Sequence, residues 1–493
     1  MLALSFPTFG HPAVAWVALV PLLVTLRAGS LVRALALGFA AGLIYFTGTL
    51  YWITRVMAVY GGLQTLVAGL VNALLIAYLS LFPAVFALIT RRLVALYGPR
   101  ALLVSPLVWV ATELGRTYLL TGFPWVLLGY SQTTVLPIAQ IASLFGVYGL
   151  SALVALVSAS AALAFTAAER DGGAAPFTFR RLLPLTAAAA LVIGFAAWGS
   201  VRLARGTLTT GTPIRVGLVQ GNVEQGQKWD PARAPAIFGD HLRMTREAIA
   251  QGAELVLWPE SANPFPFEAE HNSSEAIRRL AREARVPILL GSEQIERGVP
   301  TTYYNSAFMV RPDGSTGGVY RKMHLVPFGE YVPLKRLLFF AAPLVEASGD
   351  FAAGESAVLL PIGDRPISTA ICYEVVYPDL VRRFVAEGSQ LLTTITNDAW
   401  FGDTSAPYQH FAQASMRAIE NGRYLVRAAN TGISGVVDPY GRVLVQSKLF
   451  QPAVVVSDVS YQTATTLYTR IGDLFAYLST LATLGMLLGK LKI

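Results

Sequence analysis

The sequence contains a single cysteine, Cys372, among its 493 residues. One thiol excludes an intramolecular disulfide and any metal site built from several cysteines. A free cysteine often behaves as a small buried hydrophobe, so Cys372 has two interpretations, core packing or nucleophilic chemistry. It ends the apolar run "ISTAIC" and directly precedes Tyr373 and Glu374.

Charged residues are also scarce. They make up 14% of the chain, whereas 54% of the residues are hydrophobic, and a typical soluble domain has about a quarter charged residues. This composition predicts a membrane protein, at least in part. The formal net charge of +8 would suit nucleic acid, but the sequence has no basic block and no zinc finger. No nucleic-acid partner is therefore expected.

The apolar residues gather in stretches of about the length that crosses a bilayer. We predict spans near 12–27, 34–53, 63–89, 101–120, 138–167, 182–200 and 472–489. Between 213 and 460 charges become frequent. The sequence therefore predicts N-terminal transmembrane helices in 1–205, a soluble catalytic domain in 213–460 and a C-terminal transmembrane helix in 470–493.

Basic residues of the short loops predict the orientation, because such residues mark the cytoplasmic side of a membrane. They lie after the first, third and fifth predicted spans and at the C-terminus: Arg27, Arg33, Arg91, Arg92, Arg100, Arg170, Arg180, Arg181, Lys490 and Lys492. The alternate loops contain little beyond Arg55. The soluble domain is therefore expected outside the cytoplasm.

Two charges lie within a predicted span. Glu113 and Arg116 are three residues apart on one helical face, where they are expected either to pair with each other or to contact a lipid headgroup. The stretch that follows, "TGFPWVLLGYSQ" (121–132), is apolar and aromatic but broken by glycine and proline. It predicts a loop at the outer interface, which either shapes a lipid entrance or forms an ordinary aromatic belt.

The soluble part alternates apolar strands with helical stretches, which predicts an α/β domain with covered sheets. Strands are predicted at 214–223, 253–261, 286–295, 305–314, 367–374 and 390–401, and helices at 275–285 and 408–423. Functional residues of such domains gather where strands end. The candidates for chemistry are therefore sought at those ends.

A carboxylate, an ammonium and a thiol occupy such positions. Glu260 closes "LVLWPE", Cys372 closes "ISTAIC", and Lys322 lies in the loop "YRKMHLVPFGEYVP". If they converge, Lys322 favours the thiolate and stabilises an oxyanion. Glu260 accepts the thiol proton as a general base and returns it as an acid. The backbone N–H that follows Cys372 is a second candidate oxyanion donor.

Four motifs, "LWPES", "YRKMHLVPFGEYVP", "ICYE" and "TNDAWFG", occur in this order and resemble the nitrilase superfamily. Together with the spans, the whole chain resembles the bacterial apolipoprotein N-acyltransferases. The resemblance implies a helical transmembrane bundle joined to a periplasmic α-β-β-α sandwich, in the cytoplasmic (inner) membrane. Members of that family usually have eight spans, one more than the seven predicted here.

The same resemblance implies roles for individual residues. Glu260 is expected to be the general base, Lys322 the oxyanion-stabilising lysine and Cys372 the acylated nucleophile. Supporting roles are implied for Glu330 near the lysine, Tyr373 and Glu374 beside the nucleophile, and Trp229 at the substrate cleft. Neither a cofactor nor a metal is expected.

The function implied is transfer of a fatty acyl chain from a membrane phospholipid, through a Cys372 thioester, to the N-terminal α-amine of diacylglyceryl-cysteine in an apolipoprotein. This is the last step of lipoprotein maturation, and a monomer is expected. One alternative is a membrane-tethered nitrilase-type amidase acting on a small amide, but a tether needs only one span. The other is a non-catalytic lipid-binding or transport protein, against which the presence of Glu260, Lys322 and Cys372 together argues.

Four further polar residues are interpreted as structural. His324 is expected to form a loop hydrogen bond, and His410 to pack within its predicted helix, since it has no partner at metal-ligand spacing. Asn397 and Asp398 are expected to orient the loop beside the site rather than to act in catalysis.

Overall fold

The computed structural model describes residues 1–170, 179–331 and 351–489 of the chain. Lys490 and Lys492, and the side chains of Arg170, Arg180 and Arg181, lie outside the described part. The chain divides into two compact units. The first comprises Met1–Thr54, Gln64–Arg205 and Arg470–Ile493, and the second comprises Arg55–Leu63 and Gly206–Thr469.

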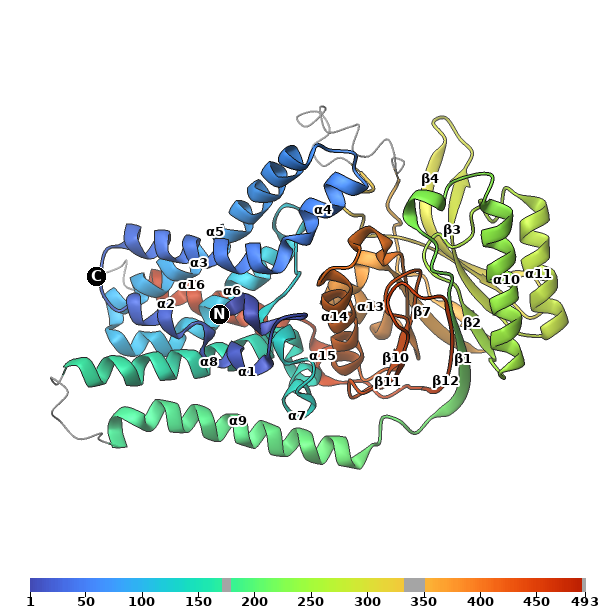
Figure 1. Cartoon of the computed structure of the whole chain (residues 1–493). Coiled ribbons are helices and arrows are strands. Elements are labelled where there is room, and N and C mark those ends of the chain that lie inside the picture. The colour runs from blue at the N-terminus through green and yellow to red at the C-terminus, as the bar shows by residue number, and fades with distance from the viewer. Residues whose placement is uncertain (171–178, 332–350, 490–493) are drawn as a thin grey trace. The chain divides into compact units, whose positions relative to one another are not determined.

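The first unit is helical (Figure 1). Its main helices are α1 (Pro12–Ala18), α2 (Val20–Thr25), α3 (Leu31–Leu50), α5 (Thr65–Tyr97), α6 (Ser105–Tyr118), α7 (Leu136–Ala139), α8 (Ala142–Arg170), α9 (Phe179–Arg205) and α16 (Leu474–Leu488). Every predicted apolar stretch is therefore largely helical. Within the described residues, four helical segments are long and apolar enough to cross a membrane: Leu31–Leu50, Thr65–Tyr97, Ala142–Phe165 and Leu182–Arg205.

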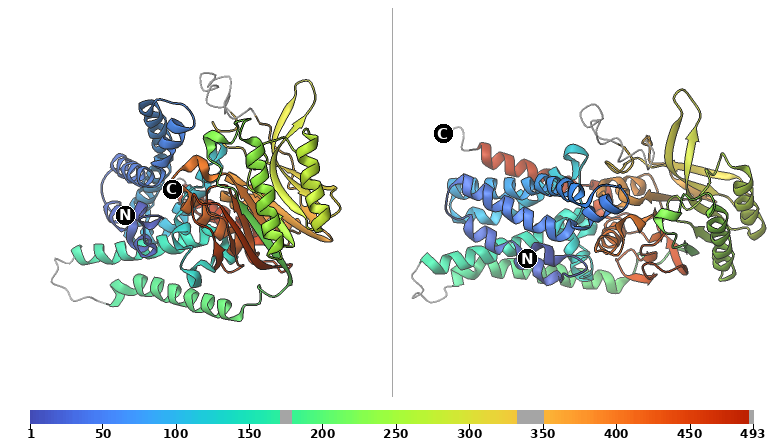
Figure 2. Two further views of the ribbon diagram at one scale, coloured as in Figure 1. Left: turned by 45° about the vertical axis from the view of Figure 1, so that its right-hand side comes forward. Right: turned by 45° about the horizontal axis from the view of Figure 1, so that its top comes forward.

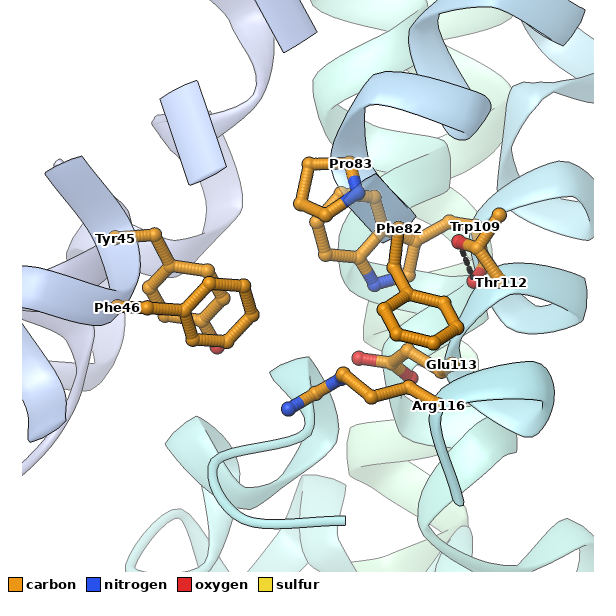
Figure 3. Close-up of a pocket in the computed structure, with 8 residues that line it drawn as sticks. All are labelled: Tyr45, Phe46, Phe82, Pro83, Trp109, Thr112, Glu113 and Arg116. Carbon is orange, nitrogen blue, oxygen red and sulfur yellow. Dashed lines mark hydrogen bonds between the residues drawn. The ribbon is translucent and has the colours of Figure 1, made fainter. Parts of the chain in front are cut away.

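The two charges of α6 bind the backbone of the loop that follows it. Glu113 Oε1 accepts the N–H of Leu128 at 2.6 Å, and Arg116 Nη1 donates to the carbonyl of Trp125 at 2.6 Å. Each residue is 3% exposed. The cavity beside them, shown in Figure 3, has a volume of about 10 Å³. It has room for about one water molecule.

The second unit contains two six-stranded sheets. The first has the order β12-β1-β2-β3-β4-β5, and its strands are β1 (Thr212–Gln220), β2 (Leu255–Leu257), β3 (Ile288–Glu296), β4 (Thr302–Val310), β5 (Thr316–Arg321) and β12 (Ala453–Tyr461). The second has the order β11-β10-β9-β8-β7-β6, with β6 (Leu360–Ile362), β7 (Arg365–Ile371), β8 (Leu392–Thr396), β9 (Leu425–Ala429), β10 (Gly435–Val437) and β11 (Val443–Gln446).

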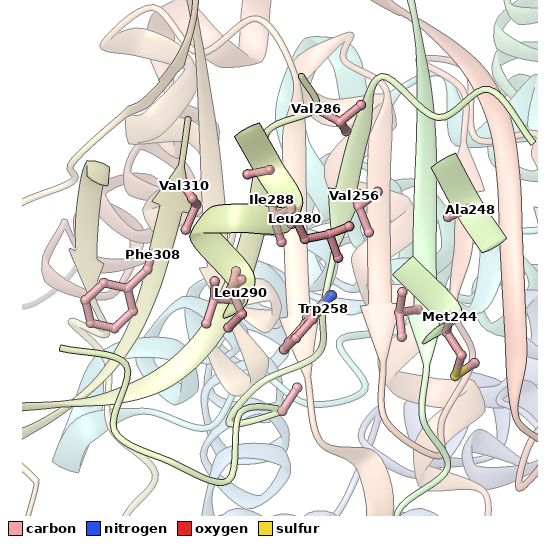
Figure 4. Packing of buried hydrophobic residues seen from close by; sticks show 14 of the residues in the cluster. Met244, Ala248, Val256, Trp258, Leu280, Val286, Ile288, Leu290, Phe308 and Val310 are labelled. Carbon is pink, nitrogen blue, oxygen red and sulfur yellow. The ribbon is translucent and has the colours of Figure 1, made fainter. Parts of the chain in front are cut away.

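Helices cover the outer face of each sheet, as Figures 1 and 2 show. Helices α10 (Ala234–Ala250) and α11 (His271–Ala284) lie on the first sheet, and α13 (Pro378–Ala386) and α14 (Ala406–Asn421) on the second. Figure 4 shows the apolar core under α10 and α11, where buried side chains of these helices meet those of the strands; its members include Met244, Leu280, Val256, Trp258, Ile288 and Phe308. The predicted α-β-β-α sandwich is confirmed.

The strand directions bring several loop residues to one edge. Strands β1, β2 and β3 are parallel, as are β7, β8 and β9, so their carboxyl ends share an edge within each sheet. Strand β5 ends at the same edge as β3, because the antiparallel strand β4 separates them. Glu260, Lys322 and Cys372 follow β2, β5 and β7, respectively.

A short N-terminal segment also belongs to the second unit. It contains the end of α4 (Trp52–Val59) and the residues up to Leu63. The Tyr60 ring packs edge-on against Trp400, with the ring centroids 5.5 Å apart. The segment therefore contacts the turn after β8.

Candidate active site

The Lys322 ammonium lies at the centre of a buried polar cluster. Its side chain is 1% exposed, and Nζ lies 2.8 Å from Glu330 Oε1 and 3.4 Å from Glu260 Oε1. Asn305 on β4 donates from Nδ2 to the same two oxygens, at 2.8 Å for Glu260 and 2.9 Å for Glu330. The N–H of Val326 binds Glu330 Oε2 at 2.8 Å. The structure thus brings the predicted lysine together with both predicted carboxylates.

The turn that carries Glu260 packs closely on β3. A Cβ at Gly291 would lie 2.5 Å from the carbonyl oxygen of Pro259 and 2.7 Å from Glu260 Cα, so this position requires glycine. The other carboxylate oxygen, Glu260 Oε2, accepts the N–H of Asn397 at 2.9 Å. Asn397 directly follows β8. Glu260 is therefore held by groups from both sheets.

Cys372 occupies a sharp turn between β7 and the 3₁₀ helix Cys372–Val376. Its φ is +53°, a value that residues other than glycine rarely adopt. The residue as a whole is partly exposed, whereas its thiol group is enclosed by protein atoms. The preceding N–H, of Ile371, donates to Glu374 Oε2 at 2.7 Å.

Glu374 connects this turn to the loop that carries Lys322. It is fully buried, and its Oε1 accepts three hydrogen bonds, from the Tyr320 hydroxyl at 2.7 Å and from the N–H groups of Met323 at 2.7 Å and His324 at 3.1 Å. The predicted supporting residue Glu374 thus orders the segments on both sides of the site. The hydrogen bond from His324 is made by its backbone N–H, so the loop hydrogen bond expected of its side chain stays a prediction.

Comparison with known proteins shows the family of the chain. Residues 215–468 match the carbon–nitrogen hydrolase family, and residues 1–160 match the apolipoprotein N-acyltransferase N-terminal domain. An apolipoprotein N-acyltransferase of Geobacter metallireducens is 42% identical over 484 residues, covering 97% of this chain and 91% of the relative. One of Methylococcus capsulatus is 35% identical over 481 residues, covering 96% and 91%.

The chain belongs to the apolipoprotein N-acyltransferase family. Its relatives are bacterial proteins, and with its apolar helices it is a bacterial membrane protein. Among solved structures, an amidase from Nesterenkonia sp. covers 55% of this chain and 97% of its own length, at 24% identity and a TM-score of 0.42.

The charges of the site follow from burial and from the pairs described above. Burial disfavours a charged Glu260, but the Lys322 ammonium and the Asn305 hydrogen bond outweigh burial and lower its pKa. Burial likewise disfavours the Lys322 ammonium, but the carboxylates of Glu330 and Glu260 outweigh it and raise the lysine pKa. Both groups are therefore charged at neutral pH.

The surroundings of Cys372 favour the protonated thiol over the thiolate. Burial raises its pKa well above the ordinary value, and the negative charge of Glu260 adds to this effect. Lys322 lowers the thiol pKa, as the sequence suggested, but not enough to compensate. The role expected of Lys322 in favouring the thiolate stays a prediction, and burial is the largest influence on the thiol pKa. A base must take the thiol proton when the sulfur attacks.

Two site residues were not found by sequence reasoning. Asn305 lies within a strand, and its position opposite Glu260 appears only when the sheet forms. Lys228 is 4% exposed and donates from Nζ to the Glu260 carbonyl at 3.1 Å. Burial lowers the Lys228 pKa to about 8, against the raising effect of Glu260. Its only signal in the sequence is its place beside Trp229 in "QKWDP".

The remaining predicted residues lie around the cluster. Trp229 is 48% exposed, and Lys228 Nζ lies 5.7 Å from the centroid of its ring. Tyr373 is buried, and its ring centroid is 5.9 Å from that of His324. Within the described part of the chain, no cluster of three or more His, Cys, Asp or Glu side chains has the arrangement of a metal site.

Proposed function

We propose that the protein transfers a fatty acyl chain from a membrane phospholipid to the N-terminal α-amine of a diacylglyceryl-cysteine apolipoprotein, with Cys372 as the carrier. The strongest support is the buried ion pair between Lys322 and Glu260, together with the electrostatic influence of both groups on the Cys372 thiol. The similarity to named N-acyltransferases extends over nearly the whole chain. The spanning helices suit a reaction between two lipid-embedded substrates.

In the first half-reaction, the Glu260 carboxylate accepts the thiol proton as the Cys372 sulfur attacks the ester carbonyl of the phospholipid. A C–S bond forms and the carbonyl oxygen becomes an oxyanion, which the Lys322 ammonium and the Tyr373 N–H stabilise. Collapse breaks the ester C–O bond. Protonated Glu260 gives its proton to the departing oxygen, so the products are a lyso-phospholipid and a Cys372 thioester.

In the second half-reaction, the neutral α-amine of the acceptor attacks the thioester carbonyl. Glu260 accepts a proton from the nitrogen as the C–N bond forms, and the same two donors stabilise the oxyanion. The C–S bond then breaks, and the proton on Glu260 returns to sulfur. The site is restored with a protonated thiol, which is the resting state that burial favours.

The supporting residues hold the catalytic groups in position. Glu330 holds the Lys322 ammonium at 2.8 Å while Glu260 exchanges protons. Glu374 fixes the turn of the nucleophile against the loop of the lysine. Trp229, which is half exposed, is suited to contact the substrate.

We further propose that the enzyme is a monomer in the bacterial inner membrane, with helices in 1–205 and 470–493 and with the catalytic domain 213–460 on the periplasmic face. The loop arginines support this orientation. Apolipoprotein termini lie on that side, so the site must face it.

The test is a transfer assay with purified full-length protein in phospholipid vesicles. A synthetic peptide that begins with diacylglyceryl-cysteine should gain the mass of one acyl chain, and lyso-phospholipid should appear in equal amount. Cys372→Ala should give neither product. Release of ammonia from small amides, with no consumption of phospholipid, would instead identify the amidase alternative.

A further inference from the structure

A buried histidine contacts the backbone carbonyl of the predicted nucleophile. His410 on α14 is fully buried, and its Nε2 lies 3.2 Å from the carbonyl oxygen of Cys372. Its Nδ1 lies 3.0 Å from Asp398 Oδ1. Arg427 Nη2 lies 2.8 Å from Asp398 Oδ2 and 3.0 Å from His410 Nδ1. The sequence interpretation of His410 as ordinary helix packing misses these contacts.

The network determines which ring nitrogen of His410 carries hydrogen. The Cys372 carbonyl oxygen only accepts hydrogen bonds, so a bond to it requires a hydrogen on Nε2. Burial and the positive charge of Arg427 lower the His410 pKa, which favours the neutral ring. In that ring Nε2 carries the hydrogen and Nδ1 accepts from Arg427, so Asp398 acts on the ring through the Arg427 guanidinium that it holds. A protonated ring would also present Nε2–H to the carbonyl.

The bond to the carbonyl fixes the direction of the neighbouring amide. The Cys372 carbonyl and the Tyr373 N–H belong to one planar trans peptide, so they point in opposite directions. A donor that holds the carbonyl therefore turns the Tyr373 N–H away from His410. Glu374 accepts a hydrogen bond from the N–H of Ile371, the residue before Cys372. Together these bonds hold Cys372 at its unfavourable positive φ.

We propose that His410, oriented by Asp398 and Arg427, is a positioning residue that aims the Tyr373 N–H at the acyl oxyanion. The inference rests on the proposed acyl-transfer function, because it assigns that N–H to the oxyanion site. It predicts that the network matters for reactions that pass through an oxyanion. Reactions of the same sulfur that form no oxyanion should depend on it little.

Two matched variants separate the roles of the two ring nitrogens. In His410→Gln the amide nitrogen is as many bonds from Cα as Nε2, so it can donate to the Cys372 carbonyl. In His410→Asn the amide nitrogen corresponds to Nδ1, so it reaches only Asp398 and Arg427. Both variants lose the ring, and a merely structural role predicts similar effects for both.

The experiment uses full-length protein in detergent micelles with two reagents for Cys372. A soluble p-nitrophenyl ester acylates the thiol through an oxyanion, whereas iodoacetamide alkylates it by direct displacement. For His410→Asn we expect ester acylation to slow by roughly 10²- to 10³-fold, the effect of losing an oxyanion donor. For His410→Gln we expect a loss within about tenfold, a small change in barrier. Alkylation should stay near the wild-type rate in both.

Two further variants complete the test. Gly432→Ala places a Cβ 2.3 Å from Asp398 Oδ2, so it should disturb the network without changing His410 and should slow acylation but not alkylation. It also provides the test if His410→Asn does not fold. His241→Asn replaces another buried histidine of the same unit and should leave ester acylation unchanged.

Wild-type acylation rates in folded His410→Asn, or equal losses of acylation and alkylation, would overturn the positioning role. Because the ester assay does not use phospholipid, it tests the role of His410 independently of the proposed transferase function. If the wild-type protein reacts with the ester but never with phospholipid, the transferase proposal fails while the positioning role is still decided by the variants.

Discussion

Replacement of Lys322 by methionine should affect stability and catalysis through two separable causes. The lysine is 1% exposed and contacts both Glu330 and Glu260. Removing one partner of a buried ion pair costs about 3–5 kcal/mol, because the other charge stays buried. For a domain of this size each kcal/mol corresponds to about 2–4 °C in Tm, so Lys322→Met should lower the thermal midpoint by roughly 6–20 °C.

The two remaining carboxylates would share only the Asn305 amide, whose nitrogen lies 2.8 Å from Glu260 and 2.9 Å from Glu330. Like charges this close cannot both stay ionised, so one carboxyl takes up a proton. Glu330→Gln, added to Lys322→Met, removes that repulsion and should restore part of the stability. It cannot restore the oxyanion donor, so acylation should stay slower by roughly 10²- to 10³-fold.

The assay measures thermal unfolding by intrinsic fluorescence in detergent and lyso-phospholipid release from vesicles for the same preparations. Lys448→Met, at an exposed lysine of the same unit, is the control and should change neither quantity. The reasoning is refuted if Lys322→Met keeps turnover within a few-fold of wild type. It is also refuted if the double variant recovers activity together with stability, since the lysine would then be only structural.

Further predictions concern the surroundings of the site and its orientation. Glu374→Gln should destabilise the protein by about 1–3 kcal/mol, because the NH2 group of the amide cannot accept the hydrogen bonds that a carboxyl oxygen accepts from the buried donors. Burial raises the pKa of Glu374 in the folded protein to about 7, so the protonated carboxyl stabilises the fold. This stabilisation is complete at a pH below the pKa of Glu374 in the unfolded chain, and it is lost as the pH rises through 7. The Tm difference between wild type and Glu374→Gln should therefore shrink between about pH 5 and pH 8; a constant difference would contradict the assignment. Lys228→Met should slow acylation about tenfold or more by releasing the Glu260 carbonyl from a charged donor, and an unchanged rate would show that this contact is dispensable. A tag after Arg92 should report cytoplasm and a tag at Gly298 the outside, and a cytoplasmic result at Gly298 would exclude apolipoproteins as substrates.

The sequence predicts much of the fold because its signals are local. The strands before Glu260 and Cys372 are short apolar runs, and the helices of the first unit are long apolar ones, so both follow from composition and period. The ends of those strands indicated where chemistry would lie. The loop motif around Lys322 supplied the third group, although its contact with Glu260 depends on the order of the strands.

What the sequence could not supply are contacts between elements far apart along the chain. His410 approaches the Cys372 carbonyl only because α14 packs behind the turn after β7. Asn305 and Lys228 acquire their partners in the same way. Glu113 and Arg116 share a helical face, as predicted, but bind the backbone of the following loop. The protonated state of the thiol depends on desolvation, which no motif reveals.

The central claim is that Cys372 carries the acyl chain, and an intact mass spectrum tests it most directly. Full-length protein incubated with phospholipid alone should gain the mass of one acyl chain on Cys372, with an equal amount of lyso-phospholipid released. Neutral hydroxylamine should remove this mass, as should a peptide with a free diacylglyceryl-cysteine amine, whereas its N-acetylated form should leave the adduct intact. An unmodified Cys372, or lyso-phospholipid released continuously without an acceptor, would contradict the account.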